Sequence, residues 1–118
     1  MLRRSRRLST EQFNEVIKKG KAFHSLFFQL RISRNPGEPT RAAAVAPVKM
    51  AKKAVARNDL RRRIYEIVSP LLPDSVVGYH VIVFAKPTLL PAGEAKAPSD
   101  AAVVEDLKAL FVKAGILR

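Results

Sequence analysis

The sequence predicts an α+β domain in which helices are interspersed with the strands of one mixed sheet. Three observations lead to this prediction. Apolar residues recur at helical spacing in three segments, and three others, residues 21–33, 41–48 and 79–85, have the composition of strands. A strand–helix–strand passage between residues 41 and 85 implies a parallel pair of strands inside a mixed sheet. The length of 118 residues suits a single domain spanning residues 1–118.

The first helix is expected over LSTEQFNEVIKKG, because both of its ends carry sequence signals. Ser9 is a suitable N-cap, and Gln12, three residues later, completes a capping box. Gly20 offers a left-handed stop after two lysines. The apolar side of this helix is expected to consist of Phe13, Val16 and Ile17.

Two strands joined as a hairpin are predicted next, over residues 21–33 and 41–48. In the first, the residues of one parity suit the core side of a strand: Ala22, Leu26, Phe28, Leu30 and Ile32. The intervening RNPGEPT, residues 34–40, is rich in turn-forming residues and is expected to be a loop. Pro47 must lie near the end of the second strand or on an edge.

The remaining elements are a basic helix, a buried strand and a closing helix. The basic helix covers 52–68 and is expected to stop at Ser69-Pro70; its buried face comprises Leu60, Ile64, Ile67, Val68 and Leu71. Residues 79–85 are almost all apolar, as in a strand covered on both faces. Residues 88–98 are expected to form a flexible loop. The last helix, from Asp100 to near Gly115, buries Val103, Leu107, Leu110, Phe111 and Ala114.

The charge of the chain is strongly positive and unevenly distributed. The net charge is +12. Residues 1–63 hold 17 Lys and Arg against 4 Asp and Glu, whereas residues 64–118 hold 5 against 6. Such an excess indicates a polyanionic partner, and nucleic acid is the leading candidate. The basic segments lack the large apolar face of a membrane-surface helix. The chain has no Cys, no apolar run long enough to span a bilayer and no secretory signal, so a cytoplasmic protein is expected.

The basic helix, KKAVARNDLRRRIYEIV, presents its polar residues in a definite order. Asn58 and Arg62 are expected opposite the buried face, with Arg61 and Tyr65 beside them. Arg57 lies at the border of the core and could extend outward. This arrangement predicts a cationic surface on one side of the helix.

The arginines of this helix are not expected to be equivalent. Arg63 follows Asp59 by four residues and precedes Glu66 by three, a spacing that favours ion pairs within a helix. Arg57, Arg61 and Arg62 are expected to lack an acidic partner at helical spacing, apart from Glu66 four residues after Arg62. The helix is entered through three lysines, Lys49, Lys52 and Lys53, against the direction of its own dipole. A cationic first turn suggests that an external anion, such as phosphate, binds there.

The segment APVKMAKKAVARNDLRRRIYEIV, residues 46–68, resembles the signature of the protein subunit of bacterial ribonuclease P. LSTEQFNEVIKKGKAFHSLFFQLRI resembles the first helix and first strands of that family, GYHVIVFAKP its last strand and VEDLKALFVKA its closing helix. The resemblance implies a single two-layer α+β domain of order αβββαβα, with a mixed four-stranded sheet and a left-handed βαβ crossover. It also implies a protein that binds the catalytic RNA and the 5′ leader of precursor tRNA. Hydrolysis would use Mg²⁺ held chiefly by the RNA.

The resemblance also assigns candidate site residues. The residues expected to bind RNA are Lys49, Lys52, Lys53, Arg57, Asn58, Arg61, Arg62 and Tyr65. A leader cleft between the first helix and the sheet would be lined by Phe13, Ile17 and Arg31. The chain departs from the family pattern at Asp59, where a basic residue is usual, and at Tyr65, where Arg is common. Tyr65 could therefore contact a base or sugar by stacking.

Other functions fit the same residues less well. A nuclease acting alone would need clustered carboxylates, and the acidic residues here are scattered; His24 and His80 lie far apart in the chain. No residue of this protein is therefore expected to be catalytic or to bind a metal. A structural RNA-binding protein, such as a ribosome-associated factor, is the alternative; a DNA-binding protein ranks third. Phe23 and Phe27 could be exposed aromatic residues or could pack on a strand face.

Overall fold

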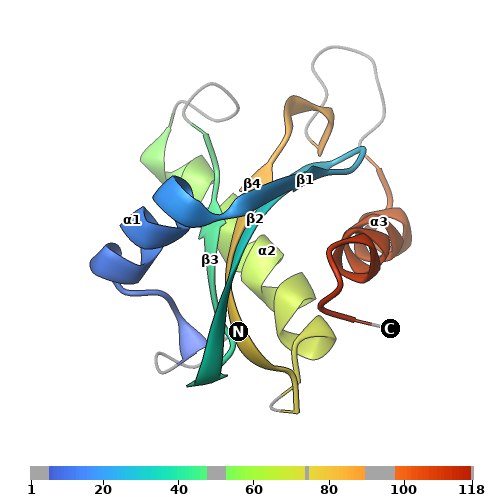
Figure 1. Cartoon of the computed structure of the whole chain (residues 1–118). Coiled ribbons are helices and arrows are strands. Elements are labelled where there is room, and N and C mark those ends of the chain that lie inside the picture. The colour runs from blue at the N-terminus through green and yellow to red at the C-terminus, as the bar shows by residue number, and fades with distance from the viewer. Residues whose placement is uncertain (1–5, 48–52, 74, 90–97, 118) are drawn as a thin grey trace.

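The computed structural model describes residues 6–47, 53–73, 75–89 and 98–117 of the 118-residue chain. The elements follow in the order α1 (Thr10–Lys19), β1 (Lys21–His24), β2 (Phe28–Pro39), β3 (Arg41–Val45), α2 (Ala54–Leu71), β4 (Val77–Ala85), the 3₁₀ turn η2 (Pro87–Leu89) and α3 (Asp100–Lys113). This arrangement confirms the α+β class and the predicted order αβββαβα (Figure 1).

The sheet has the strand order β1-β2-β4-β3, with β4 inserted between β2 and β3. Strand β4 runs antiparallel to β2 and parallel to β3. The passage β3–α2–β4 therefore joins two neighbouring parallel strands, which confirms the predicted mixed sheet. The left-handedness of this crossover stays a prediction.

The predicted hairpin between residues 21–33 and 41–48 is wrong. Residues 21–33 contain a hairpin of their own, in which β1 pairs with β2 from Lys21 opposite Ile32 to His24 opposite Gln29. The predicted loop 34–40 is mostly a continuation of β2, with an irregular register between Arg34 and Pro39. Strand β3 pairs with β4 instead of β2, because the long apolar strand β4 occupies the centre of the sheet.

A single carboxylate fixes the turn between β1 and β2. Asp106 of α3 accepts hydrogen bonds from the Ser25 hydroxyl at 2.6 Å and from the backbone N–H groups of Phe27 at 3.1 Å and Leu26 at 3.3 Å. Leu26 is consequently turned outward, with 62% of its surface exposed, and Ala22 is exposed as well. The sequence did not reveal this turn, because the alternation of apolar residues continues across it from residue 22 to residue 32.

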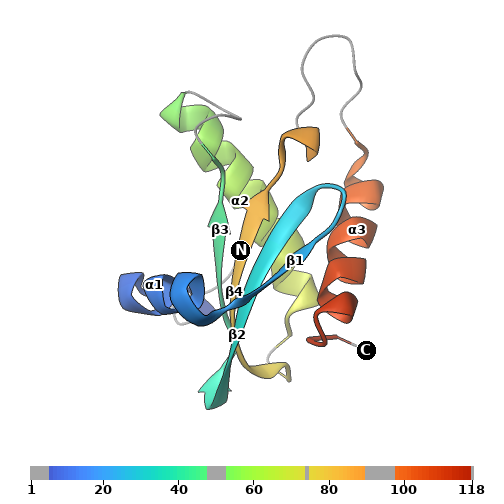
Figure 2. The same ribbon diagram turned by 45° about the horizontal axis from the view of Figure 1, so that its top comes forward.

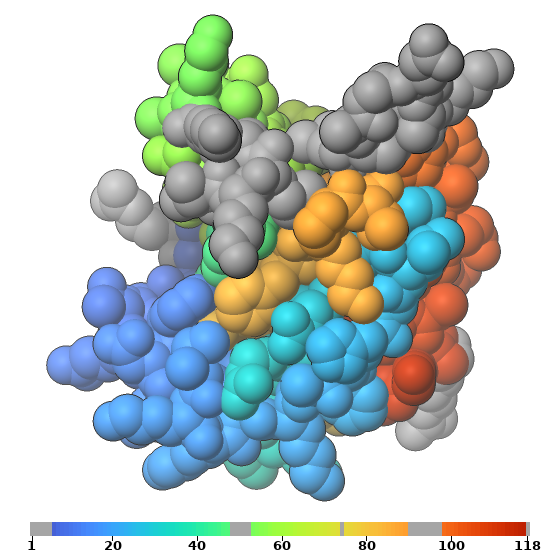
Figure 3. Space-filling view, turned by 90° about the horizontal axis from the view of Figure 1, so that it is seen from above, coloured from blue at the N-terminus to red at the C-terminus, as the bar shows by residue number. Residues whose placement is uncertain are grey.

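The main core lies between one face of the sheet and the helices α2 and α3 (Figures 1 and 2). It contains residues of one parity from each of the strands β2, β3 and β4, among them Phe28, Leu30, Ala42, Ala44, Val81 and Val83. Helix α1 contacts β2 and β4 and lies on the opposite face, where Val16 and Ile82 are fully buried. Figure 3 shows β1 and β2 lying between α1 and α3 in a view from above.

The ends of the helices follow the sequence signals in part. The capping box is confirmed: Gln12 N–H donates to the Ser9 hydroxyl, and the Ser9 N–H donates to the Gln12 side chain. Gly20 is not a left-handed stop, since its φ is −71°. It is required for space: a Cβ at Gly20 would lie 2.5 Å from the Val16 carbonyl oxygen.

Helix α2 does not stop at Ser69-Pro70 but continues to Leu71. The proline removes one backbone donor in the last turn. The turn persists because Leu72 is buried to 1% exposure and its N–H bonds the Val68 carbonyl at 3.0 Å. The buried Arg6 guanidinium also donates to the Leu72 carbonyl at 3.1 Å.

The last helix agrees with the sequence, whereas the start of the loop expected before it does not. Helix α3 has Ser99 as its N-cap and buries the predicted Val103, Leu107, Leu110 and Phe111, and it is followed by Gly115 at φ 85°. Of the loop expected at 88–98, residues 90–97 lie outside the described residues, and Leu89 at the end of η2 is buried. In the described segments, none of the helices has the length and apolarity needed to cross a bilayer.

Candidate nucleic-acid interface

The first turn of α2 is unusual in its lack of negative charge. Lys53 occupies the N-cap position without a side-chain capping bond, and the first turn contains no acidic residue. Lys53, Asn58, Arg61 and Arg62 are exposed, and Arg57 is half-buried. The positive end of the helix dipole therefore lies at the same end of α2 as the cationic side chains of Lys53 and Arg57. Lys49 and Lys52, also expected to bind RNA, lie outside the described residues.

Two side chains of α2 hold this helix against the outer edge of the sheet. The Ala44 N–H of β3 donates to the Tyr65 hydroxyl at 3.2 Å, and the Arg61 Nε donates to the Ala44 carbonyl at 3.3 Å. Since β3 is an edge strand, these bonds satisfy backbone groups that would otherwise lack a partner strand. Arg61 thus has one guanidinium N–H engaged, while its side chain stays exposed.

The expected exposure of Tyr65 is wrong. Tyr65 is only 6% exposed and packs in the core cluster, because α2 leans its flank against β3. The Arg7 guanidinium lies 5.0 Å from the centre of the Tyr65 ring, within the range of a cation–π contact. Tyr65 therefore lies at the floor of the basic surface rather than on top of it. Its predicted stacking on a base stays untested.

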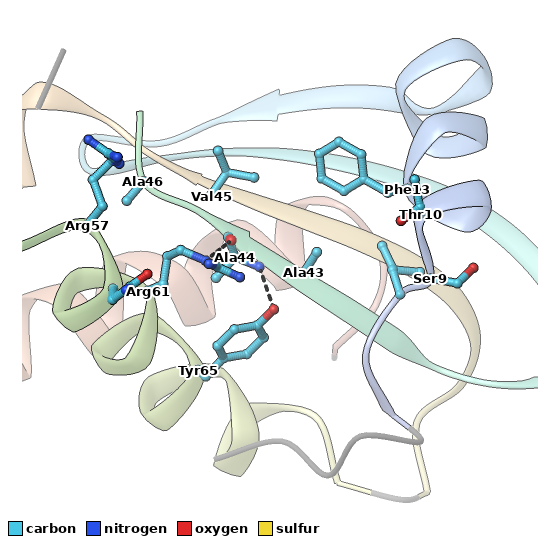
Figure 4. Close-up of a pocket in the computed structure, with 12 residues that line it drawn as sticks. Ser9, Thr10, Phe13, Ala43, Ala44, Val45, Ala46, Arg57, Arg61 and Tyr65 are labelled. Carbon is cyan, nitrogen blue, oxygen red and sulfur yellow. Dashed lines mark hydrogen bonds between the residues drawn. The ribbon is translucent and has the colours of Figure 1, made fainter. Parts of the chain in front are cut away.

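A groove of about 450 Å³ lies between α1, β3 and α2 (Figure 4). We call it the α2–β3 groove. Its walls come from Leu8, Ser9, Thr10 and Phe13, from residues 43–46 of β3 and its continuation, and from Arg57, Asn58, Arg61 and Tyr65 of α2. Figure 4 shows Phe13 of α1 at one end and Arg57 at the other, with Val45 between them. Four of the predicted RNA-binding residues and one predicted cleft residue thus share one surface.

The ion pairs of α2 differ from the predicted ones. Asp59 pairs with Arg62 at 3.1 Å, three residues later on the helix. Arg63 pairs with Asp100 at the start of α3 instead of with Asp59 or Glu66. The prediction that Glu66 is the one acidic residue at helical spacing from Arg62 overlooked Asp59, three residues before it. The prediction that Arg63 is neutralised is confirmed, but its acidic partner comes from another helix that sequence spacing could not bring near.

The three residues expected to line a leader cleft are brought together only in part. Phe13 is half-buried and lines the α2–β3 groove, whereas Ile17 is 39% exposed and lies one turn further along α1. The Arg31 guanidinium donates to the carbonyl oxygens of Ile17 at 2.7 Å and Gly20 at 3.2 Å. Arg31 therefore closes the C-terminal end of α1. The stripe predicted for α1 buries Val16 alone completely.

The sequence reasoning missed Arg6 and Arg7. Arg6 is buried, and its Nε donates to the Thr40 carbonyl at 2.6 Å. Arg7 bridges to Ala42 at the outer edge of β3 and reaches the Tyr65 ring. The basic run in the first seven residues signals charge in the sequence, but no local pattern reveals its structural part. The structure describes two arginines of this run: Arg6 is buried, and Arg7 lies at the outer edge of β3.

The titratable groups show no arrangement of catalytic type in the described part of the chain. Groups of three or more His, Asp or Glu side chains suited to a metal ion are absent there. Buried His80 approaches the Glu38 carboxylate at 3.1 Å without the geometry of a hydrogen bond. Burial lowers the pKa of His80 from 6.5, although Glu38 opposes this shift. His80 lies on β4, away from the residues that line the α2–β3 groove.

Comparison with known proteins gives one consistent result. A family model for ribonuclease P matches residues 1–115. The ribonuclease P protein component of Microcystis aeruginosa is 30% identical over 112 residues, covering 91% of this chain and 88% of the relative. That of Lactiplantibacillus plantarum is 29% identical over 108 residues, covering 91% and 93%. A Synechococcus relative of the same name is 38% identical over 66 residues, which are 56% of this chain and 50% of the relative.

Solved structures share the fold. The ribonuclease P protein from Thermotoga maritima superimposes with a TM-score of 0.73 at 25% identity, covering 91% of this chain and 96% of the other. A ribonuclease P protein structure from Staphylococcus aureus gives a TM-score of 0.76 at 18% identity, covering 98% and 100%. The similarity thus extends over the whole described domain, including α2 and the β3 edge.

Proposed function

Because this chain belongs to the ribonuclease P protein family, and is thereby a protein subunit of an endoribonuclease, we propose that its α2 surface binds the catalytic RNA of that enzyme. The observation that supports this proposal is that Lys53, Asn58 and Arg62 are all exposed, on a helix whose first turn contains no acidic residue. RNA phosphates are the anions that such a surface binds best. Lys49 and Lys52, just ahead of α2, belong to the same proposal.

The bonds from α2 to β3 support this assignment by giving the cations a fixed position. Tyr65 and Arg61 attach the helix to Ala44, so Arg57 and Asn58, one turn earlier, project over the groove. A rigid phosphate-binding surface loses less side-chain entropy on binding than a flexible one. We therefore assign Arg61 and Tyr65 two roles: each fixes the helix, and each lines the groove.

The 5′ leader of precursor tRNA is the ligand we propose for the α2–β3 groove and the sheet face beside α1. The groove combines the Phe13 ring and the apolar Val45 with the cation Arg57 at its rim. Single-stranded RNA is bound by this combination of aromatic side chains and a positive groove. Ile17 extends the apolar surface along α1, and Arg31 holds the end of that helix in place.

The Mg²⁺ used in hydrolysis is proposed to be held chiefly by the RNA. Three of the described carboxylates already have structural roles: Asp59 pairs with Arg62, Asp100 pairs with Arg63, and Asp106 fixes the β1–β2 turn. The protein would contribute positive charge where the RNA phosphates crowd together. We propose the cytoplasm as its location, since precursor tRNA is the substrate.

Reconstitution tests the proposal. Purified RNA-free protein should leave precursor tRNA intact in Mg²⁺, and addition of the catalytic RNA should give cleavage at the mature 5′ end. The protein should raise the rate most at low Mg²⁺, where its cations supply the largest share of phosphate neutralisation. Specific cleavage by the protein alone, or an RNA reaction indifferent to the protein at low Mg²⁺, would refute it. Recovery of ribosomal RNA instead of one structured RNA in a pull-down would contradict the proposed partner.

A further inference from the structure

A second groove, of about 610 Å³, lies on the other side of α1. We call it the α1–α3 groove. Its charged lining residues are Glu15, Lys19, Lys21 and Arg34, its aromatic ones are Phe23 and Tyr79, and the end of α3 closes it at Ala114 and Gly115. With 100° per residue, Lys19 and Phe13 lie on different sides of α1, so this groove is separate from the α2–β3 groove.

The lining of the α1–α3 groove joins positive charge to aromatic rings. Lys19, Lys21 and Arg34 are exposed and outnumber the single acid Glu15. Phe23 and Tyr79 are half-buried: each packs against the core and also lines the groove. The Arg34 guanidinium lies 5.8 Å from the centre of the Tyr79 ring, within cation–π range. Aromatic rings flanked by cations are the means by which proteins bind single-stranded nucleic acid.

The sheet leaves this side of β2 accessible. Strand β1 pairs with β2 only as far as Ile32, opposite Lys21, while β2 continues to Pro39. The groove therefore runs along β2 where its partner strand has ended. Packing against the core accounts for one side of each aromatic ring. It does not account for the three cations around the groove, none of which comes from α2.

We propose that the α1–α3 groove binds a segment of single-stranded RNA from the same ribonucleoprotein. The bases would stack on Tyr79 and Phe23, and the phosphates would contact Lys19, Lys21 and Arg34. This inference rests on the proposed function, because it presumes RNA as the partner. It adds a second RNA-binding surface, separated from the α2–β3 groove by the width of α1.

Site-resolved titration of the ¹⁵N-labelled full chain with a six-nucleotide oligouridine RNA would test this. The amides of Tyr79 and Gly115 should shift and give their own dissociation constant, distinct from that at Asn58. Tyr79→Leu keeps apolar bulk but removes the ring, so affinity at this groove should fall roughly five- to hundredfold. Tyr79→Phe should retain it. Thermal unfolding of both variants establishes that they are folded.

Charge is tested by a pair of matched double variants. Lys21→Ala with Arg34→Ala should lower the salt dependence of oligouridine binding at this groove, by roughly 0.7 in slope for each phosphate that is no longer neutralised. Lys18→Ala with Lys108→Ala removes the same charge from exposed positions outside the groove and should not. An equal decrease in both double variants, or shifts confined to the α2–β3 groove, would overturn the proposal. A wild-type chain that supports cleavage without shifts at Tyr79 and Gly115 would refute this inference alone.

Discussion

Asp59 pairs with Arg62 on the surface proposed to bind RNA, so neutralising it should strengthen binding by a small and calculable amount. The carboxylate lies 3.1 Å from the Arg62 guanidinium, and the two side chains are 63% and 61% exposed. Such a pair contributes about 0.3–0.5 kcal/mol to the helix. Asp59→Asn should therefore lower the free energy of unfolding by no more than that, while leaving Arg62 wholly available to a phosphate.

The gain in RNA affinity follows from Coulomb's law. If the nearest phosphate is about 10 Å from Asp59, the repulsion in water is about 0.4 kcal/mol, roughly a twofold change in affinity. At physiological ionic strength the Debye length is about 8 Å, so most of this repulsion is screened. We expect Asp59→Asn to bind the catalytic RNA about twofold more tightly in low salt and almost equally well near 0.15 M salt.

The assay is the dissociation constant for the catalytic RNA measured over a series of salt concentrations. Glu105→Gln serves as the control, because Glu105 is an exposed acid on α3, a different helix. It removes the same charge and should change the low-salt affinity less. A tenfold gain for Asp59→Asn at physiological salt, about 1.4 kcal/mol, would refute the reasoning. Position 59 would then lie directly at a phosphate.

Three further predictions test the structure more briefly. Tyr65→Phe should lower the free energy of unfolding, measured by chemical denaturation, by about 1–3 kcal/mol, because the Ala44 N–H loses its acceptor. The salt slope of RNA binding should not change. Unaltered stability together with tenfold weaker binding would mean that Tyr65 contacts RNA. Gly20→Ala should lower the melting temperature, because its Cβ would meet the Val16 carbonyl at 2.5 Å; an unchanged value would show that α1 shifts freely. Because the pKa of His80 is lowered in the folded protein, the unfolded chain takes up the proton first, and stability should fall as pH drops below about 6.5. His80→Gln should flatten this pH dependence of the free energy of unfolding, measured in urea titrations at pH 5 to 7. An identical pH dependence in the variant would exclude His80 as its source.

The sequence predicted the helices better than the connections between strands. Each helix carries local signals, such as the Ser9 capping box and the apolar stripe of α3, and both were confirmed. The β1–β2 turn depends on Asp106, about 80 residues away in the chain, and no local pattern reveals it. The pairing of β3 with β4 is likewise a contact between segments distant in the chain, whereas proximity in sequence had suggested pairing with β2.

The candidate site shows a similar division between local and distant information. The helical wheel placed Arg62 and Asn58 outward, as the structure does. It misplaced Tyr65, because a wheel describes one buried face, and α2 also leans its flank on the β3 edge. It assigned Arg63 the right role with the wrong partner, since Asp100 is remote in sequence. The fold, and not the helix alone, decides which cations are neutralised.

Helix α2 therefore serves the core and the proposed RNA surface along one continuous segment, and the bonds to Ala44 connect the two functions. Leu60, Ile64 and Val68 are buried between the sheet and α3, which fixes the axis of the helix. Tyr65 and Arg61 then hold its rotation, because both side chains bond the backbone of Ala44 on β3. With axis and rotation set, Arg57, Asn58 and Arg62 have defined directions before any RNA arrives. Loss of the Tyr65 hydroxyl should therefore weaken RNA binding by loosening the position of the helix, with the salt slope unchanged, whereas loss of Arg62 should lower the salt slope directly.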